Sequence, residues 1–226
     1  MKVICIICAR GGSKGLKNKN LLKIKNKSLI QITFEHAKKS KLFDKIILST
    51  DSNKIISSTK KFKFDKIIKR PKKLSTDKAG KVQAIKHALQ YSESIYNQKF
   101  DYIVDLDVTS PLRDILDIKK AFQKMIKNNS DNLITICDSK KNPYFNMIKI
   151  RNNMPIPIFK TKKFMSRQSA PDVFDMNASI YIWKRNSLLK KPLFNKKTTY
   201  YKMPIERSID IDNYLDYKLV KFLYEK

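Results

Sequence analysis

The chain has 226 residues, 42% of them hydrophobic, which is enough for one α/β domain with its own core and excludes wholesale disorder. The formal net charge is +29, but the excess is mostly lysine spread along the chain, which indicates a basic surface rather than base reading by arginine. Three cysteines argue against a disulfide framework, no apolar run reaches the ~20 residues that span a bilayer, and residues 1–12 lack a signal-peptide cleavage site, so we expect a cytoplasmic protein without nucleic-acid or membrane partners.

Strands and helices alternate through the first half of the sequence. Residues 2–9 are apolar after Lys2 and rich in β-branched side chains, which is typical of a buried parallel strand. After it we predict helices over 28–40, 52–60, 79–96 and 115–127, and strands over 43–50, 64–69, 102–107 and 133–137. On helix 79–96 we expect Val82, Ile85, Ala88, Leu89 and Ile95 to face the core.

This alternation predicts βαβ units, and therefore a three-layer α/β fold around a mainly parallel sheet. Ligands bind such sheets beyond the carboxyl ends of the strands. We therefore expect the loops at 10–19 and 70–80 to meet the end of strand 102–107 in one cleft.

The pattern changes from about residue 139. Residues 139–176 hold four prolines, several aromatic residues and short alternating stretches, which predict a β-rich insertion. A buried strand over 178–183 and a closing helix over 214–224 follow. We therefore divide the chain into a main domain of residues 1–138 and 177–226 and an insertion of residues 139–176.

Glycine is concentrated in one loop. The chain has only 4 glycines, and Gly11, Gly12 and Gly15 all follow the first predicted strand. Residues 1–27 contain eight Lys or Arg and no Asp or Glu, and backbone N–H groups beside fixed cations bind phosphate. The spacing fits neither the GxxxxGK[ST] nor the GxGxxG pattern. The loop predicts a phosphate site of another kind, with a plain basic turn as the alternative.

Two aspartates precede the closing helix. Asp210 and Asp212 point to the same side of an extended segment, and paired carboxylates suit Mg²⁺, which also binds substrate phosphates. Helix N-capping is the alternative. Cys5 and Cys8 face opposite sides of their strand and are expected in the core, without zinc. His36 and His87 have no partner motif and are expected to be structural or surface residues.

Several motifs together resemble one known family. The loop 9–20 resembles the signature of nucleotidylyltransferases that activate sugar acids, the CMP-sialic acid (N-acylneuraminate) synthetases. Four further stretches resemble motifs of that family in the same order, and the likeness covers nearly the whole chain. These stretches are Arg70-Pro71 with residues 74–77, Leu106 to Arg113, Ser166-Arg167-Gln168 with Asn177 to Ile182, and Ser208 to Asp212.

The resemblance implies a cytidylyltransferase that transfers CMP from CTP to the anomeric hydroxyl of a nonulosonic acid, of sialic, legionaminic or pseudaminic type, and releases pyrophosphate. It implies Mg²⁺ as cofactor and a homodimer held by the insertion. One alternative is the same fold acting with another nucleotide or an aminosugar phosphate. A non-catalytic basic RNA-binding protein is the other alternative, and Asp210 and Asp212 disfavour it because phosphate binding gains nothing from fixed acids.

The resemblance also implies roles for individual residues. Arg10, Lys19 and Asp212 are expected to be catalytic, and Asp210 and Asp212 to bind the metal. The expected nucleotide-binding residues are Arg10, Gly11, Gly12, Ser13, Lys14, Lys19, Asn20, Arg70, Ala79 and Lys81. The expected sugar-binding residues are Asp107, Arg167, Gln168, Asn177 and Tyr181.

The sequence departs from the family pattern at two of these positions. Asp107 stands where the family usually has Gln, and Lys81 where it often has Ser. We expect Asp107 to contact the metal, the sugar acid or a lysine of the basic loop.

Overall fold

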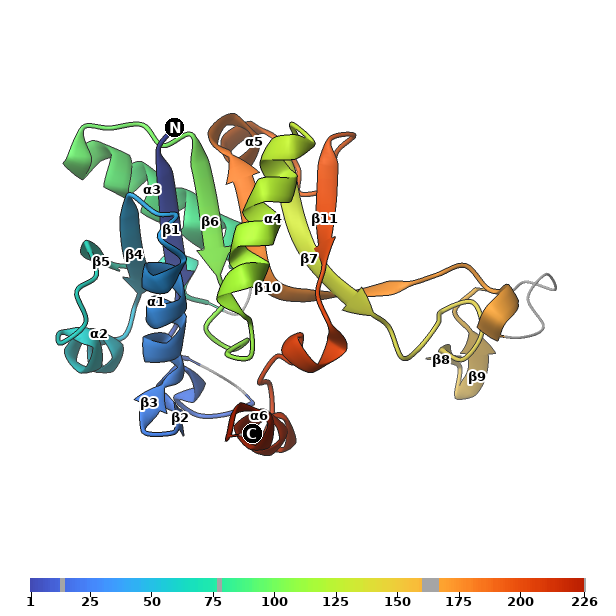
Figure 1. Cartoon of the computed structure of the whole chain (residues 1–226). Coiled ribbons are helices and arrows are strands. Elements are labelled where there is room, and N and C mark those ends of the chain that lie inside the picture. Colours follow the sequence, from blue (N-terminus) through green and yellow to red (C-terminus); the bar gives the residue numbers. More distant parts are fainter. Residues whose placement is uncertain (13–14, 77–78, 160–166, 226) are drawn as a thin grey trace.

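The computed structural model describes residues 1–12, 15–76, 79–159 and 167–225. Its centre is a seven-stranded sheet in the order β11-β7-β10-β6-β1-β4-β5 (Figure 1). The strands are β1 (Val3–Cys8), β4 (Lys45–Thr50), β5 (Lys66–Lys69), β6 (Tyr102–Leu106), β7 (Asn132–Asp138), β10 (Phe174–Lys184) and β11 (Thr198–Lys202).

The sheet is mainly parallel, as predicted. Strand β1 pairs in parallel with β4 and β6, β4 with β5, and β7 with β11. Strand β10 is the exception, because it returns from the insertion and runs antiparallel to both β6 and β7. The carboxyl ends of β1, β4 and β6 therefore lie at one edge of the sheet.

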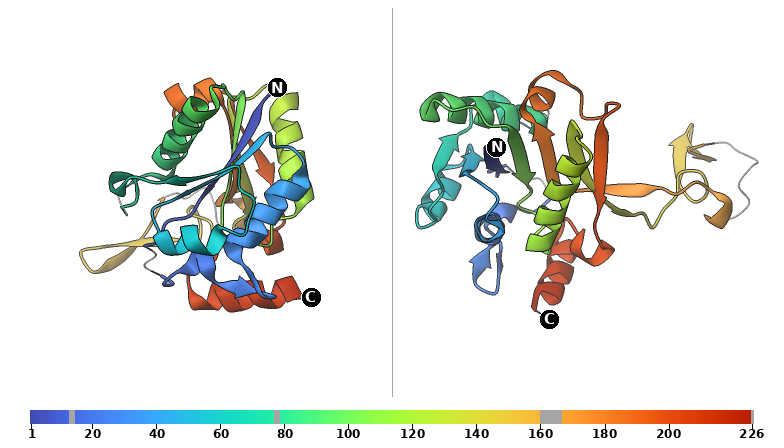
Figure 2. Two further views of the ribbon diagram at one scale, coloured as in Figure 1. Left: turned by 90° about the vertical axis from the view of Figure 1, so that its left-hand side faces the viewer. Right: turned by 45° about the horizontal axis from the view of Figure 1, so that its top comes forward.

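Helices cover both faces of the sheet and make the predicted three layers. Helices α1 (Leu29–Ser40) and α4 (Ile115–Lys127) lie on one face, and α3 (Lys81–Tyr96) lies on the other (Figure 2, left). The remaining elements are α2 (Asn53–Thr59), α5 (Arg185–Lys190), α6 (Tyr214–Glu225), the short strands β2 (Lys23–Ile24) and β3 (Lys27–Ser28), and the 3-10 helices η1 (Lys19–Leu21), η2 (Lys72–Leu74), η3 (Arg167–Ser169) and η4 (Ile205–Arg207). Within the described ranges no helix has the length and apolar character to cross a membrane.

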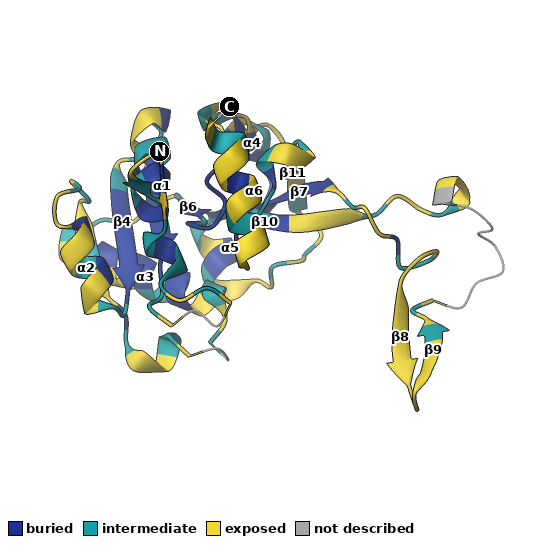
Figure 3. Cartoon of the chain, turned by 90° about the horizontal axis from the view of Figure 1, so that it is seen from below, coloured by how far each residue is buried: buried dark blue, intermediate teal, exposed yellow. Residues whose placement is uncertain are grey.

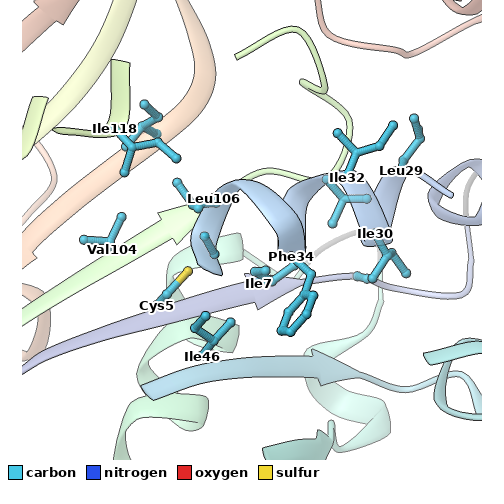
Figure 4. Close-up of a cluster of buried hydrophobic side chains, with 14 of the residues drawn as sticks. Cys5, Ile7, Leu29, Ile30, Ile32, Phe34, Ile46, Val104, Leu106 and Ile118 are labelled. Carbon is cyan, nitrogen blue, oxygen red and sulfur yellow. The ribbon is translucent and has the colours of Figure 1, made fainter. Parts of the chain in front are cut away.

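Strand β1 is apolar throughout because both of its faces are covered by helices and buried. Cys5 and Ile7 pack in the cluster under α1 and α4, with Leu29 and Phe34 (Figure 4). The alternate residues of the strand belong to a second cluster on the α3 face. Cys5 and Cys8 thus contact opposite layers, as predicted, and all three cysteines are free.

Helix α3 departs from its predicted inner face at one position. Ile95 is 42% exposed, whereas Glu93 is buried in the same turn. Glu93 is tolerated there because Arg185 binds it through two hydrogen bonds of 2.6 and 2.8 Å and the Phe100 N–H donates a third of 3.2 Å.

The described residues between β7 and β10, which we call the extension, lie away from the sheet (Figure 1). The extension carries a hairpin of β8 (Ile148–Arg151) and β9 (Met154–Pro157), whose turn residues Asn152 and Asn153 both have positive φ. The hairpin is largely exposed (Figure 3). Residues 174–176, which the sequence placed in the insertion, pair with the end of β7, so β10 begins earlier than predicted.

Candidate active site

A cavity of about 310 Å³ lies where β1 and β6 end. The loop after β1, the loop before α3 and the residues after β6 all line it, as the strand-end rule predicted. Among the expected nucleotide-binding residues, the lining includes Arg10, Lys19, Asn20, Arg70, Ala79 and Lys81. Asp107 and Asp210 bound the same cavity, so cations and carboxylates share one space.

The glycines of the loop allow close packing against neighbouring segments. A Cβ on Gly11 would lie 2.8 Å from Ser52 Cβ, and one on Gly15 would lie 2.2 Å from the backbone oxygen of Asp212. The Gly11 N–H, expected to serve a phosphate, donates instead to Asp51 Oδ1 at 2.8 Å. Gly12 is exposed, and the expected contacts of Ser13 and Lys14 lie outside the described residues.

Arg10, Lys19 and Arg70 form the cationic wall of the cavity, and buried polar contacts hold it in place. Asn20 is the buried middle residue of η1, and its Nδ2 donates to the backbone oxygen of Arg10 at 2.9 Å. Arg70 is 7% exposed and is anchored on β4, where it donates to Ser49 Oγ at 3.2 Å and Ser49 O at 2.9 Å. Both residues are therefore fixed before any ligand binds.

The acidic segment, residues 210–212, contacts the glycine loop through Lys19. Lys19 Nζ lies 2.9 Å from Asp212 Oδ1 and donates to Ile211 O at 3.1 Å. Ile211 is fully buried and its N–H donates to Thr109 O at 2.9 Å, so the segment is held between the loop and the end of β6. Asn213 accepts the capping hydrogen bonds of α6, from the N–H groups of residues 215 and 216. Asp212 therefore does not serve as the helix cap.

Asp210 has the properties of an unsatisfied carboxylate. One of its oxygens, Oδ1, is buried without a hydrogen-bond partner among the described residues. Burial raises the pKa of Asp210 to about 6, and repulsion from Asp107 and Asp212 adds to the effect. A bound cation would relieve both costs, so Asp210 and Asp212 fit a Mg²⁺ site. Within the described chain, no group of three or more His, Cys, Asp or Glu is placed to hold a metal ion.

A second cavity, of about 420 Å³, adjoins Asp210 from the side of β10. Asp210, Asp212 and Asn177 line it, and Asp210 also lines the first cavity. Asp210 and Asp212 therefore do face one side, with buried Ile211 between them, as the sequence predicted.

Asn177, expected to contact the sugar, is already saturated by the protein. Its Oδ1 accepts from Thr135 Oγ1 at 2.6 Å and from the Ser179 N–H at 3.2 Å, and its Nδ2 donates to Ser208 Oγ at 2.8 Å. It lies in an irregularity of β10, where Ala178 has φ 53°. Asn177 thus positions Ser208, two residues before Asp210.

The other expected sugar-binding residues lie apart. Tyr181 is 9% exposed and packs in the core against Trp183, with ring centroids 5.6 Å apart, and lines neither cavity. Gln168 is exposed in η3 and lines neither cavity. The side chain of Arg167 lies outside the described residues. Within the described part of one chain, these residues do not form one pocket.

Asp107 is paired with a lysine. Its Oδ2 lies 2.6 Å from Lys81 Nζ, and its Oδ1 accepts from Thr109 N at 2.9 Å and Thr109 Oγ1 at 2.7 Å. Burial alone would raise the pKa of Asp107, but Lys81 and Thr109 hold it well below its usual range. The lysine belongs to α3, and not to the basic loop as expected.

Three residues to which the sequence patterns assigned no functional role also shape this site. Asp51, after β4, holds the glycine loop, and its position at a strand end was the available signal. Arg113 is fully buried and donates to Ser179 O at 2.6 Å and Asp107 O at 2.9 Å, joining β10 to the end of β6. Cys8 lines the cavity, but burial raises its pKa to about 12, so its thiol is a poor nucleophile.

Comparisons with known sequences agree with this geometry. A family model described as cytidylyltransferase matches residues 4–225. The chain is 42% identical to post-translational flagellin modification protein B of Campylobacter coli, over 100% of this chain and 96% of that protein. It is 44% identical to the CMP-N,N′-diacetyllegionaminic acid synthase of Campylobacter jejuni, over 98% and 94% respectively. It is 33% identical to the N-acylneuraminate cytidylyltransferase of Escherichia coli, over 100% of this chain but only 52% of that protein.

Solved structures show the same fold at low identity. CMP:2-keto-3-deoxy-manno-octonic acid synthetase, complexed with CTP, superposes with a TM-score of 0.71 at 15% identity, covering 100% of this chain and 99% of that one. The 4-diphosphocytidyl-2C-methyl-D-erythritol synthase of Anaerococcus prevotii superposes with a TM-score of 0.66 at 14% identity, covering 100% and 96%. The fold is that of the nucleotidylyltransferases. The chain belongs to the cytidylyltransferase family, among the CMP-nonulosonic acid synthetases.

Proposed function

We infer that the protein transfers CMP from CTP to the anomeric hydroxyl of a nonulosonic acid of the legionaminic type and releases pyrophosphate. The observation that carries this inference is the cavity bounded by Arg10, Lys19 and Arg70, which shares Asp210 with a second cavity. Two adjoining spaces with a carboxylate between them suit a nucleotide and an acceptor that meet at one phosphate. The legionaminic assignment rests on 44% identity to the Campylobacter jejuni synthase, against 30% to a pseudaminic acid cytidylyltransferase.

The cationic wall is proposed to bind the nucleotide. Arg10 and Lys19 would neutralise phosphate oxygens, and Arg70, Ala79 and Asn20 would bound the nucleoside. The acceptor hydroxyl forms a new P–O bond at the α-phosphate as the bond to pyrophosphate breaks. Negative charge on the phosphates then faces groups that are already in place, which is the main source of rate in such reactions.

Asp210 and Asp212 are proposed to hold Mg²⁺, which when bound would stabilise charge on the α-phosphate. Lys19 now lies 2.9 Å from Asp212 Oδ1, so its ammonium already balances that carboxylate. When the site is loaded, Lys19 is placed to exchange Asp212 for a phosphate oxygen. This exchange accounts for a catalytic lysine and a metal-binding aspartate that contact each other.

We further propose that the extension joins two copies of the chain. Ile148 and Ile150 are 60% and 66% exposed on a two-stranded hairpin, and such a hairpin is marginal without a surface to pack against. Gln168 belongs to η3, between the hairpin and β10, and lines neither cavity of its own chain. Its expected contact with the sugar acid would therefore be made in the partner's site.

Pyrophosphate release tests the proposal. The purified protein is given CTP, UTP, GTP or ATP, each with N,N′-diacetyllegionaminic, pseudaminic or N-acetylneuraminic acid or with an aminosugar phosphate, with and without Mg²⁺. We expect release only with CTP and Mg²⁺, fastest with the legionaminic acid. Release with another nucleotide and an aminosugar phosphate, and none with CTP, would favour the alternative substrate class.

A further inference from the structure

Lys81 lies between two aspartates at the end of β6. Its Nζ is 2.5 Å from Asp105 Oδ2 and 2.6 Å from Asp107 Oδ2. Asp105 is fully buried beneath it, and the ring of Tyr181 lies 5.6 Å from the ammonium. One fixed cation therefore serves two carboxylates, and Lys81 is the first residue of α3 and lines the same cavity as Asp107.

This charged group is connected to the acidic segment. Asp107 Oδ1 accepts two hydrogen bonds from Thr109, of 2.9 Å from its N–H and 2.7 Å from its hydroxyl. The backbone oxygen of the same Thr109 accepts from the Ile211 N–H at 2.9 Å. The position of Asp210 and Asp212 thus depends on a turn that Asp107 holds.

Asp105 and Asp107 have the same chemistry and spacing as Asp210 and Asp212. Without a positive group between them, two adjacent carboxylates at the same strand end would attract a divalent cation of their own. The Lys81 ammonium lies where such a cation would bridge them, and buried carboxylates need that compensation in any case.

We propose that Lys81 is a positioning residue that acts as a fixed cation: it occupies Asp105 and Asp107, confines divalent-cation binding to Asp210 and Asp212, and holds that pair in place through Thr109. The inference deepens the proposed function and rests on its Mg²⁺ site. It assigns one divalent-cation position to this strand end, and gives Asp107 a role in organising the site instead of reading the sugar acid.

Binding of Mn²⁺ to the nucleotide-free protein tests this assignment. Electron paramagnetic resonance of free Mn²⁺ counts the bound ions in the wild type, in Lys81→Met and in Lys86→Met. The matched control Lys86 lies on the same helix but donates to Leu189 O, away from both cavities. We expect Lys81→Met to gain one Mn²⁺ per chain that binds at least tenfold more tightly than any additional Mn²⁺ in the wild type, and Lys86→Met to behave as the wild type.

A second variant shows where the added ion binds. In Lys81→Met with Asp107→Asn, the gained Mn²⁺ should be lost while circular dichroism stays native. Added Mn²⁺ should also raise the thermal unfolding midpoint of Lys81→Met by more than that of the wild type. The bound Mn²⁺ then compensates Asp105 and Asp107 in place of the ammonium. Lys81→Gln is measured in the same way if Lys81→Met does not fold.

Unchanged Mn²⁺ number and affinity in a folded Lys81 variant would overturn the inference, since a lysine that only packs predicts that result. Pyrophosphate release by the wild type is measured alongside. If the wild type is active and the Lys81 variant binds Mn²⁺ as the wild type does, only the role proposed for Lys81 is rejected. A folded wild type that is inactive with CTP and every nonulosonic acid rejects the proposed function instead.

Discussion

Lys19 is the residue in which the two halves of the proposed site meet. It contacts Asp212 and lines the nucleotide cavity, whereas Lys23 is exposed in the same basic segment and does not line it. Lys19→Gln should therefore lower turnover by about 10²–10³-fold, because loss of a charge-stabilising donor costs ~3–4 kcal/mol in the transition state. Lys23→Gln should stay within about twofold. Equal losses in steady-state pyrophosphate release would mean that general charge, and not placement, matters.

Ala178 holds a conformation that alanine disfavours. Its φ of 53° lies in the left-handed region, beside the Asn177 contacts that position Ser208. Relief of that strain by glycine outweighs the greater freedom of the unfolded chain, so Ala178→Gly should stabilise the protein by about 1 kcal/mol. Ala88→Gly, in the interior of α3, should destabilise it by about 1 kcal/mol or more. Urea unfolding measures both changes, and destabilisation by Ala178→Gly would contradict the prediction.

His36 is a residue whose burial makes stability depend on pH. Burial lowers its pKa to about 3, whereas in the unfolded chain it is about 6.5. Between these values the unfolded chain binds more protons, so stability falls as the pH falls, by at most about 1.4 kcal/mol per pH unit.

His36→Gln should flatten the dependence of unfolding free energy on pH between pH 6 and 4. His87→Gln is the matched control, because His87 is less buried and should change the slope less. Urea unfolding at pH 7, 6, 5 and 4 measures the three slopes. A wild-type slope retained in His36→Gln would contradict the assignment.

At the scale of elements, much of the fold follows from sequence pattern. The apolar run of β1 and the alternation through α4 predict the parallel sheet, and the strand-end rule predicts that the loops at 10–19 and 70–80 share a cavity with the end of β6. The antiparallel direction of β10 does not follow locally, because it is set by the path of the insertion. Helix α5 and strand β11 are short and largely polar, and give little periodic signal.

The limits at the site have a related cause. Asn177 lies in a motif that predicts a sugar contact. The hydrogen-bonding capacity of its amide is instead used by Thr135 and Ser208, which only folding brings near it. The ion pair of Lys81 with Asp107 joins residues 26 positions apart on different elements. Hydrogen-bond saturation and ion pairing are tertiary properties, so a motif names candidate residues without assigning their atoms.

The extension provides the prediction that concerns the assembly. Ile148 and Ile150 lie on one face of the hairpin, and Lys149 and Arg151 lie on the other. If the apolar face joins two copies, changing both isoleucines to glutamate should give a monomer by light scattering. Changing Lys149 and Arg151 to glutamate should leave the dimer intact. A dimer that survives the isoleucine changes would place the contact elsewhere.

The whole molecule is proposed to make one bond, the phosphodiester between CMP and a nonulosonic acid, where the two cavities adjoin at Asp210. Phosphorus NMR of CTP incubated with N,N′-diacetyllegionaminic acid and Mg²⁺ observes that bond directly. We predict a phosphodiester signal and free pyrophosphate with the wild type, and neither with Asp212→Asn, a nearly isosteric change that removes one charge from the cation site. The absence of a phosphodiester signal with the folded wild type and every nonulosonic acid, or an undiminished signal with Asp212→Asn, would contradict the account.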